Sequence, residues 1–313
     1  MKIAVIGAGA MGSLFGGLLA KKADVVLYSH NLPYVEAVNK SGLIMTQLEK
    51  RDVVKVRATS DPADIGEVDV ALIYCKNSGT RKAVEDALVS AVGENTIVLT
   101  LQNGIGNVEV IREYVPADRI VYGFSTLTSD VKAPGHIEMT TLKRVWTYMW
   151  PVSGKVTPEL EALNTLMNDV GLDTKIAEDI DRQIWLKLMI NCSENTLCAI
   201  LRMNVSELVE TPASFAILKQ IVYEVSDVAR AKGIQISRDQ GLDHVMRVTE
   251  SVPGHVPSMV FDILKKKKTE IDSLNFAVVA EGNRLHVPTP MVETVGNMIR
   301  AMEQNYETRF DHH

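Results

Sequence analysis

This 313-residue chain has the composition of an ordinary folded protein, with 46% hydrophobic residues, 23% charged residues and a formal net charge of −6. The acidic balance, without a basic patch interleaved with aromatic residues, excludes nucleic acid as an expected partner. No apolar run reaches the roughly 18 residues that a membrane-spanning helix needs, so no membrane partner is expected. The length predicts two domains.

The first stretch predicts a dinucleotide-binding turn. Lys2–Ile6 is expected to form a short buried strand, Ser13–Lys21 a helix, and Asp24–Tyr28 a second apolar strand. A G-x-G-x-x-G sequence between the first strand and the helix is the Rossmann fingerprint in its usual context. The residues expected to contact the cofactor are Gly7, Ala8, Gly9, Ala10, Met11 and Gly12. The alternative is a glycine-rich turn that binds nothing.

The residues after the second strand indicate which nicotinamide cofactor to expect. Enzymes that use NAD place Asp or Glu here to bind the ribose 2′-OH, and that charge would repel the 2′-phosphate of NADP. This chain has Ser29, His30 and Asn31 instead. Ser and Asn can donate hydrogen bonds to a phosphate, and a protonated His adds positive charge. We therefore predict NADP(H).

The N-terminal half continues to alternate between helices and strands. The predicted helices are Tyr34–Lys40, Ser78–Val92, Asn107–Tyr114 and Pro158–Val170, and the predicted strands are Val68–Tyr74, Thr96–Leu101, Arg119–Gly123 and Thr174–Ala177. We also expect a hairpin over Leu43–Thr46 and Val53–Ala58, and antiparallel additions at the sheet edge over Gly135–Thr140 and Arg144–Trp150. This alternation predicts an α/β, doubly wound Rossmann domain for NADP(H) over residues 1–178.

The pattern changes near Glu178, beyond which almost only helical periodicity remains. The predicted helices are Gln183–Leu201, Ala213–Lys232, Leu242–Thr249, Val256–Leu264, Glu270–Arg284 and Pro290–Glu303. Residues 179–313 are therefore expected to form an all-helical domain for substrate binding and dimerisation. Its apolar faces are compatible with a homodimer. Ligands of such folds bind beyond the carboxyl ends of the parallel strands, so we expect the substrate between the two domains.

The cysteines and histidines indicate no metal site. Cys75, Cys192 and Cys198 lack metal-ligand spacing and a pairing logic, which is typical of reduced thiols in a cytoplasmic protein. The first strand begins at once, so no signal peptide is expected. His312 and His313 are compatible with a natural terminus and with the remainder of a purification tag.

Two predicted strand ends carry residues suited to ligand binding. Lys76 follows Val68–Tyr74 and could reach a phosphate or the nicotinamide ribose; the alternative is a solvated lysine. Asn103 follows Thr96–Leu101, within a loop whose two glycines allow close backbone approach. Its amide can both donate and accept, although a plain turn would look similar.

The helical half contributes a polar stripe and a second polar segment. Lys187, Asn191 and Asn195 are spaced i, i+4 and i+8, which predicts one face of an otherwise apolar helix. Such a face could orient a ketone or a carboxylate, or it could be an ordinary exposed stripe. Further on, the run Lys265–Lys268 is typical of a solvated helix end. Thr269 is suited to capping the next helix, with Asp272 at the capping-box position.

Four motifs in this order carry a family likeness: GAGAMG at 7–12, LQNGIG at 101–106, WLKLMINCSEN at 185–195, and PSM at 257–259 with TEID at 269–272. Together they resemble the ketopantoate reductases (2-dehydropantoate 2-reductases) over nearly the whole chain. The resemblance implies NADPH-dependent reduction of 2-dehydropantoate to D-pantoate in pantothenate biosynthesis. It also implies a Rossmann domain followed by a helical domain.

The resemblance assigns roles motif by motif. Lys187 would be the catalytic lysine. The implied substrate contacts are Asn103, Asn191, Asn195 and Ser258. Lys76 and Glu270 would contact the cofactor side, with Asn103 where nicotinamide and substrate meet.

The chain also departs from the family pattern. Thr196 stands where a proline is common, Val205 aligns with a substrate-contacting Asn found in some members, with Asn204 one residue off, and Phe276 replaces a usual glycine. The Arg that often reads the 2′-phosphate is missing. These departures keep open a D-2-hydroxyacid dehydrogenase for branched or aromatic 2-oxo acids, sometimes with NAD. A non-catalytic NADP(H)-binding sensor is the alternative from another class.

The mechanism expected is hydride transfer to C2 of a small-molecule 2-oxo acid. Lys187, as ammonium, would bond the ketone oxygen and deliver a proton, with a pKa lowered by burial. Asn191 and Asn195 would orient the substrate, and Ser258 would bind its carboxylate. Glu270 would hold the ribose or tune Lys187.

Overall fold

The computed structural model describes residues 1–76, 79–141 and 146–308, and in it the chain divides into two units. Unit 1 comprises Met1–Gln102 and Asn107–Ile180, and unit 2 comprises Asn103–Gly106 and Asp181–His313. The main division thus falls two residues after the expected boundary. Asn103–Gly106, which follows a strand of unit 1 in the chain, belongs to the helical unit.

Unit 1 is built on a mixed sheet in the order β12-β11-β8-β7-β6-β1-β2-β5. Its strands are β1 (Lys2–Ile6), β2 (Asp24–Tyr28), β5 (Arg57–Thr59), β6 (Val68–Ile73), β7 (Val92–Thr100), β8 (Ile120–Ser125), β11 (Thr147–Pro151) and β12 (Thr174–Ile176). Neighbouring strands from β8 to β5 run parallel, and β11 is antiparallel to β8. This confirms the Rossmann-like α/β prediction.

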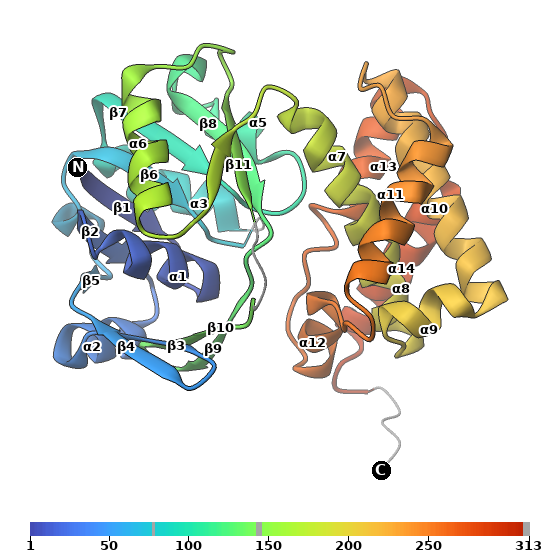
Figure 1. Ribbon diagram of the computed structural model, residues 1–313, viewed down its shortest axis with the longest axis horizontal. Coiled ribbons are helices and arrows are strands. Elements are labelled where there is room, and N and C mark those ends of the chain that lie inside the picture. Colours follow the sequence, from blue (N-terminus) through green and yellow to red (C-terminus); the bar gives the residue numbers. More distant parts are fainter. Residues whose placement is uncertain (77–78, 142–145, 309–313) are drawn as a thin grey trace. The chain divides into compact units, whose positions relative to one another are not determined.

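Both faces of this sheet are covered, because β1 sends alternate side chains into two separate cores. Ile3 and Val5 join a cluster with residues of α1 (Ala10–Leu19) and α6 (Pro158–Asp169). Ala4 and Ile6 join a second cluster, with residues of the segment 83–91 and of α5 (Asn107–Ile111). Figure 1 shows α6 in front of the sheet. Apolar residues on both faces of a strand are what a buried parallel sheet requires.

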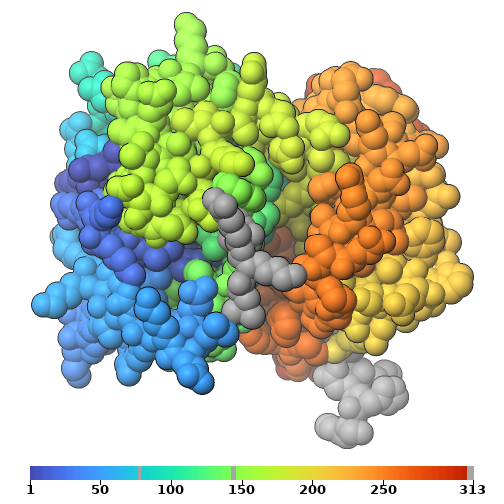
Figure 2. Space-filling view, viewed as in Figure 1, coloured from blue at the N-terminus to red at the C-terminus, as the bar shows by residue number. Residues whose placement is uncertain are grey.

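A separate four-stranded sheet, in the order β4-β3-β10-β9, corrects two predictions. Its strands are β3 (Leu43–Gln47), β4 (Lys50–Val54), β9 (Ser129–Ala133) and β10 (His136–Met139). The expected strand Val53–Ala58 is split, because β4 pairs with β3 whereas β5 pairs with β2 of the main sheet. The expected edge strand Gly135–Thr140 is wrong for the main sheet, since β10 lies between β3 and β9. Figure 2 shows the N-terminal residues, in blue, as a continuous surface of unit 1.

Other segments of unit 1 differ in their limits. The helix expected over Ser78–Val92 consists of α3 (Thr80–Ala83), a π-helical turn η3 (Val84–Leu88) and α4 (Val89–Ala91), and β7 follows directly. The remaining helical segments are α2 (Leu32–Ser41), η1 (Pro62–Asp64) and η4 (Ala117–Arg119). Of the predicted segments, Ser78, residues 144–145 and the terminal His312 and His313 lie outside the described residues.

Unit 2 is helical, as predicted. Its elements are α7 (Ile180–Ile190), η5 (Asn191–Asn195), α8 (Thr196–Leu201), α9 (Val205–Glu210), α10 (Pro212–Ala231), α11 (Arg238–Ser251), α12 (Ser258–Leu264), α13 (Asn275–Leu285) and α14 (Pro290–Gln304). The helix expected over Gln183–Leu201 is interrupted by η5, a π-helical turn. The short helix α9 was not expected, although Asn204 and Glu207 form a capping box that could have indicated it.

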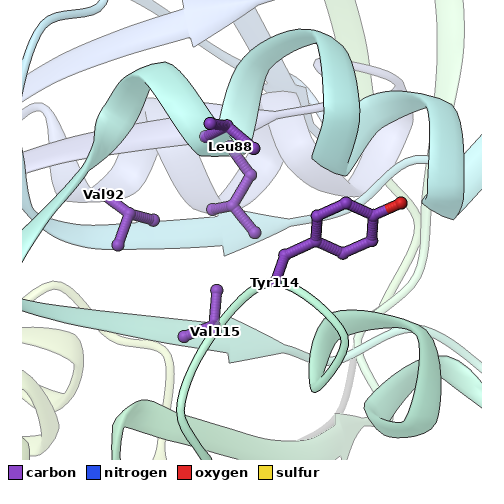
Figure 3. Close-up of a pocket in the computed structure, with 5 residues that line it drawn as sticks. Leu88, Val92, Tyr114 and Val115 are labelled. Atoms are coloured by element: carbon purple, nitrogen blue, oxygen red, sulfur yellow. The ribbon is translucent and has the colours of Figure 1, made fainter.

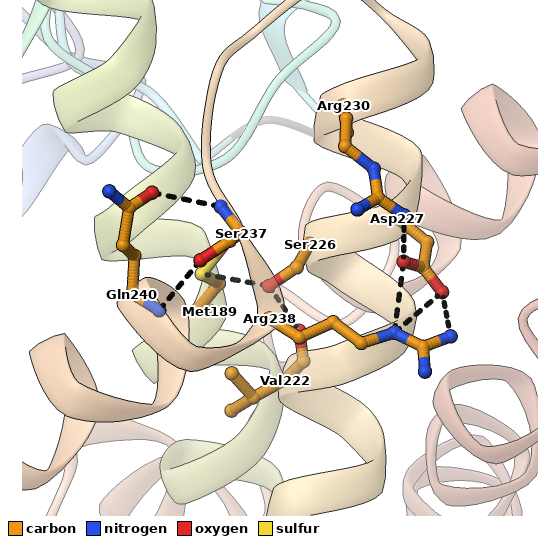
Figure 4. A network of polar contacts seen from close by, with 8 residues as sticks. All are labelled: Met189, Val222, Ser226, Asp227, Arg230, Ser237, Arg238 and Gln240. Carbon is orange, nitrogen blue, oxygen red and sulfur yellow. Dashed lines mark hydrogen bonds and ion pairs between the residues drawn. The ribbon is translucent and has the colours of Figure 1, made fainter.

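Side-chain contacts hold α7 against α10 and α11. The Ser226 hydroxyl on α10 donates to Val222 O at 2.8 Å and lies 3.8 Å from the Met189 sulfur on α7 (Figure 4). Asp227, the next residue of α10, pairs with Arg238 at the start of α11 (Figure 4). Gly241 of α11 packs close to Ser226 and Met189, where a Cβ would lie 2.8 Å from the sulfur. These contacts position the helix that carries Lys187.

Candidate active site

The glycine-rich turn after β1 has the geometry that a dinucleotide site needs. Gly7 has φ +100°, a conformation that favours glycine, and a Cβ there would clash with Cys75 backbone. A Cβ on Gly12 would clash with the Gly7 carbonyl oxygen, whereas Gly9 has open space around its Cβ position. The helix α1 begins at Ala10, earlier than the expected Ser13, and its Gly9 N-cap has no side chain to occupy the first N–H groups. A pyrophosphate fits such a helix start.

The three predicted residues after β2 have local hydrogen bonds. Asn31 caps α2, because its side-chain oxygen accepts the Tyr34 N–H at 3.2 Å. The Ser29 hydroxyl accepts the Asn31 N–H at 3.3 Å. Asn31 therefore caps α2, which begins shortly after the end of β2. The N-terminus of a helix favours an anion nearby.

A charged pair near His30 was not foreseen from the sequence. His30 Nε2 lies 3.6 Å from Asp86 Oδ2, and Lys82 Nζ pairs with the same carboxylate oxygen at 2.7 Å. Both partners come from α3 and η3, more than 50 residues beyond β2. The end of β2 thus has a carboxylate nearby, but one already paired with an ammonium.

Gln102 links the loops that follow β6 and β7. Its amide nitrogen donates to Cys75 O at 2.7 Å and to the Thr80 hydroxyl at 2.9 Å, and its oxygen accepts from the Thr100 hydroxyl at 2.9 Å. The side chain is buried. Lys76 is the residue that follows Cys75 in the chain, so it lies directly after this hydrogen bond. Sequence reasoning singled out Asn103 in the loop and missed Gln102, whose signal was a polar residue directly beside a buried strand.

Three of the predicted residues meet in unit 2. Lys187 Nζ donates to Asn103 Oδ1 at 2.9 Å, and Asn103 Nδ2 donates to Glu270 Oε2 at 3.0 Å. Burial lowers the pKa of the Lys187 ammonium to about 8, and the Glu270 carboxylate opposes this shift. The arrangement places an ammonium, an amide and a carboxylate in one chain of hydrogen bonds.

The loop that carries Asn103 is seated by its neighbours. Gly104 has φ +82°, and a Cβ there would clash with the carbonyl oxygen of Ser273. The same oxygen accepts the Ile105 N–H at 3.2 Å. The glycine and this hydrogen bond fix the backbone beside Asn103, so Gly104 has a structural reason for its identity.

Asn191 and Asn195 lie within the π turn η5. Asn195 Nδ2 donates to Asn191 Oδ1 at 3.2 Å, so the two amides face the same way. Ser258 is exposed at the start of α12.

The TEID segment forms a turn, which corrects the predicted helix start. The helix α13 begins at Asn275, and the Thr269 hydroxyl accepts the Ile271 N–H at 3.2 Å instead of capping a helix. Asp272 pairs with Arg300 of α14 at 2.6 Å. Arg300 also stacks on Phe276, 3.2 Å from the ring centroid. The bulk of Phe276 therefore packs against α14.

The departure at Val205 also has a structural explanation. Val205 is fully buried in the core of unit 2. Asn204 caps α9, because its side-chain oxygen accepts the N–H groups of Ser206 and Glu207 at 2.9 and 3.0 Å. Both side chains are thus accounted for by the fold.

A small apolar pocket in unit 1 lies apart from these residues. It is lined by Leu88, Val89, Val92, Tyr114 and Val115, with the Tyr114 ring at its rim (Figure 3). None of the predicted site residues lines it.

Residues 1–76, 79–141 and 146–308 offer neither a metal site nor a membrane-spanning helix. No group of three or more His, Cys, Asp and Glu side chains there could hold a metal ion. No helix in the same ranges is long and apolar enough to cross a membrane. The thiols of Cys192 and Cys198 are buried, and burial raises the pKa of each.

Comparisons with known proteins match one family in both units of the chain. The family described as "Ketopantoate reductase PanE/ApbA" matches residues 3–151, and its C-terminal counterpart matches residues 179–303. The 2-dehydropantoate 2-reductase of Pyrococcus abyssi is 30% identical over 303 residues, which cover 97% of this chain and 98% of that protein.

Two solved structures share the fold over nearly their full length. The ternary structure of D-mandelate dehydrogenase with NADH and anilino(oxo)acetate is 27% identical with a TM-score of 0.90, covering 99% of this chain and 100% of that one. A PanE/ApbA family ketopantoate reductase from Ralstonia eutropha is also 27% identical, with a TM-score of 0.88 over 97% of this chain and 99% of that one.

Proposed function

The chain belongs to the ketopantoate reductase PanE/ApbA family, and we propose that it reduces 2-dehydropantoate to D-pantoate with NADPH, a step of pantothenate biosynthesis. The observation that carries the proposal is the hydrogen-bonded group of Lys187, Asn103 and Glu270. A ketone reductase needs a proton donor for the developing alkoxide, and an ammonium with a lowered pKa is suited to that task.

Lys187 is the proposed general acid. Its pKa of about 8 leaves it mostly protonated at neutral pH, yet makes it a better donor than an ordinary lysine. A bound reduced nicotinamide supplies the hydride. Asn103 accepts from the ammonium and so holds it in place, and the Glu270 carboxylate keeps it charged.

Asn191, Asn195 and Ser258 are the proposed substrate-orienting residues. The paired amides of the π turn can donate to and accept from a hydroxyl or a carboxylate. Ser258, exposed at the start of α12, is proposed to donate to the substrate carboxylate. The proposal assigns substrate binding and dimerisation to unit 2.

The cofactor is assigned to unit 1. The glycine turn offers open space at Gly9 and uncapped N–H groups at the start of α1, which fit a pyrophosphate. Ala8, Ala10, Met11 and Lys76 are proposed as further contacts. Preference for NADPH is supported by His30 and Lys82, because Asp86 is already paired with the lysine.

The test is steady-state oxidation of NADPH and of NADH with 2-dehydropantoate and a panel of branched and aromatic 2-oxo acids. We expect the highest kcat/KM with 2-dehydropantoate and NADPH. A preference above tenfold for another acid would contradict the pantoate assignment. A preference for NADH would contradict the cofactor assignment alone.

A second candidate is a D-2-hydroxyacid dehydrogenase for aromatic or branched 2-oxo acids. The structural likeness to D-mandelate dehydrogenase, with a TM-score of 0.90, favours it. It would use the same lysine, so the substrate panel separates the two candidates by their preferred acid. A non-catalytic sensor would instead bind NADPH and oxidise it with none of the acids.

A further inference from the structure

The helix that carries Lys187 changes its hydrogen-bond register just before Asn195. The α-helix α7 ends at Ile190, the π turn η5 spans Asn191–Asn195, and α8 resumes at Thr196. The Thr196 N–H donates to Ser193 O. In a regular α-helix it would donate to Cys192 O, four residues back. The Cys192 carbonyl oxygen therefore does not receive its regular helical donor.

A side chain from another helix supplies a donor to that oxygen. The Asn275 amide nitrogen, from the first residue of α13, donates to Cys192 O at 3.2 Å. The Thr196 hydroxyl in turn donates to the Asn275 oxygen at 3.1 Å.

Asn275 is fully buried, and these hydrogen bonds join both ends of its amide to the π turn and its exit. A buried amide used in this way is costly to replace, because its loss leaves a carbonyl and a hydroxyl without partners. Thr196 is equally buried.

The segment before Asn275 serves the same site. Glu270 accepts from Asn103, and Ser273 O accepts the Ile105 N–H beside Gly104. One short stretch, residues 270–275, thus contacts the Asn103 loop at its start and the π turn at its end.

We propose that Asn275 is a positioning residue for the 2-oxo acid site, holding the π turn so that Asn191 and Asn195 face the substrate together with Lys187. The proposal rests on the proposed function. Asn275 acts through the π turn and touches no reacting atom. Without it, the turn relaxes toward an α-helical register, which rotates Asn195 relative to Lys187. π turns inside α-helices are frequent at functional sites, which fits this role.

The experiment compares Asn275→Ala with Asn283→Ala, an exposed residue of the same helix. Each variant is assayed with the 2-oxo acid and cofactor that the wild type prefers. For Asn275→Ala we expect KM for the 2-oxo acid to rise about tenfold and kcat to fall several-fold. The Kd of the nicotinamide cofactor, measured by fluorescence titration, should stay within about twofold, since the glycine turn belongs to unit 1. Asn283→Ala should match the wild type.

A milder pair covers the case in which Asn275→Ala does not fold. Thr196→Val keeps the side-chain shape and removes only the hydroxyl that bonds Asn275. Its control is Ser214→Ala, another buried hydroxyl of unit 2, which donates to Leu208 O at 2.7 Å. We expect a KM increase of about threefold or more for Thr196→Val alone, and Thr196→Ser should restore the wild-type KM.

Two outcomes overturn the proposal in distinguishable ways. If the wild type is active but the Asn275 and Thr196 variants keep their KM, or shift it no more than their controls, Asn275 is merely structural and the proposed function stands. If the wild type reduces no 2-oxo acid with either cofactor, the proposed function fails and this inference fails with it.

Discussion

The two units build their parts of the proposed site in different ways. In unit 1 the cofactor turn is shaped by backbone, since a Cβ on Gly7 or Gly12 would clash with main-chain atoms. In unit 2 the lysine is held by side chains distant in sequence, with Asn103 and Glu270 lying 84 and 83 residues from Lys187. A backbone site can be read from a short motif, whereas a side-chain site depends on the tertiary fold.

Replacing Lys187 should have the largest effect on the side-chain site. We expect Lys187→Ala to lower kcat by a factor of about 10²–10⁴, the contribution of one acid–base group, while the Kd of the cofactor stays unchanged. Lys187→Arg keeps the charge but holds its proton too tightly to donate it, so it should also be slow. Steady-state kinetics and cofactor titration measure both effects.

Lys265→Ala, from the exposed lysine run, is the matched control. A Lys187→Ala enzyme with near-normal turnover on its preferred acid would show that the proton comes from elsewhere.

The buried carboxyl of Glu194 should make unit 2 less stable as pH rises. Burial raises the pKa of Glu194 to about 7. The Thr249 hydroxyl contacts this carboxyl and also donates to Val245 O at 2.9 Å. A hydroxyl has only one hydrogen to donate, so the pair is best satisfied when Glu194 is protonated.

The sign of the effect follows from proton binding. Because the folded pKa lies above the unfolded one, the folded state binds more protons between about pH 4.5 and 7. The free energy of unfolding should therefore fall by up to about 3 kcal/mol across that range. Glu194→Gln should remove this fall, whereas the exposed Glu250→Gln should keep it. Urea unfolding at pH 5 and pH 8 measures this fall. If the free energy of unfolding of Glu194→Gln falls as much between the two pH values as that of the wild type, the prediction is refuted.

Substitutions at Gly12 and Gly9 test two different roles of glycine in unit 1, namely close backbone packing and close approach of the cofactor. Gly12→Ala should lower the free energy of unfolding by about 1–3 kcal/mol, because the new Cβ meets the Gly7 carbonyl. Gly9→Ala has open space and should leave stability within about 0.5 kcal/mol, while weakening cofactor binding about tenfold. Thermal unfolding and cofactor titration check the pair. Equal losses of stability in both variants would contradict the distinction.

The same contrast explains how far the sequence could predict the structure. The parallel strands and the glycine turn were predictable because hydrophobic runs and backbone needs are local. The split of Val53–Ala58 was not, because β4 and β5 join different sheets through partners elsewhere in the chain. Alternation within one strand carries no information about which sheet it enters.

In unit 2, the local sequence pattern gave wrong predictions where contacts between distant residues determine the structure. The spacing of Thr269 and Asp272 is typical of a capping box, yet Asp272 pairs with Arg300, 28 residues away. The π turn at Asn191–Asn195 was hidden because its residues fit a helical period nearly as well. The stripe of Lys187, Asn191 and Asn195 was recognisable, but the partners Asn103 and Asn275 lie far from it in sequence.

The smallest effect should be a shift of the pH profile by Glu270. If Lys187 acts as the general acid, kcat/KM for reduction should fall above about pH 8, where the ammonium loses its proton. The Glu270 carboxylate raises the pKa of the lysine, so Glu270→Gln should move this fall to lower pH. Glu293→Gln, exposed on α14, should leave the profile in place. A shift to higher pH, or none, would mean that the carboxylate does not set the charge of Lys187, and that Asn103 alone holds the side-chain site together.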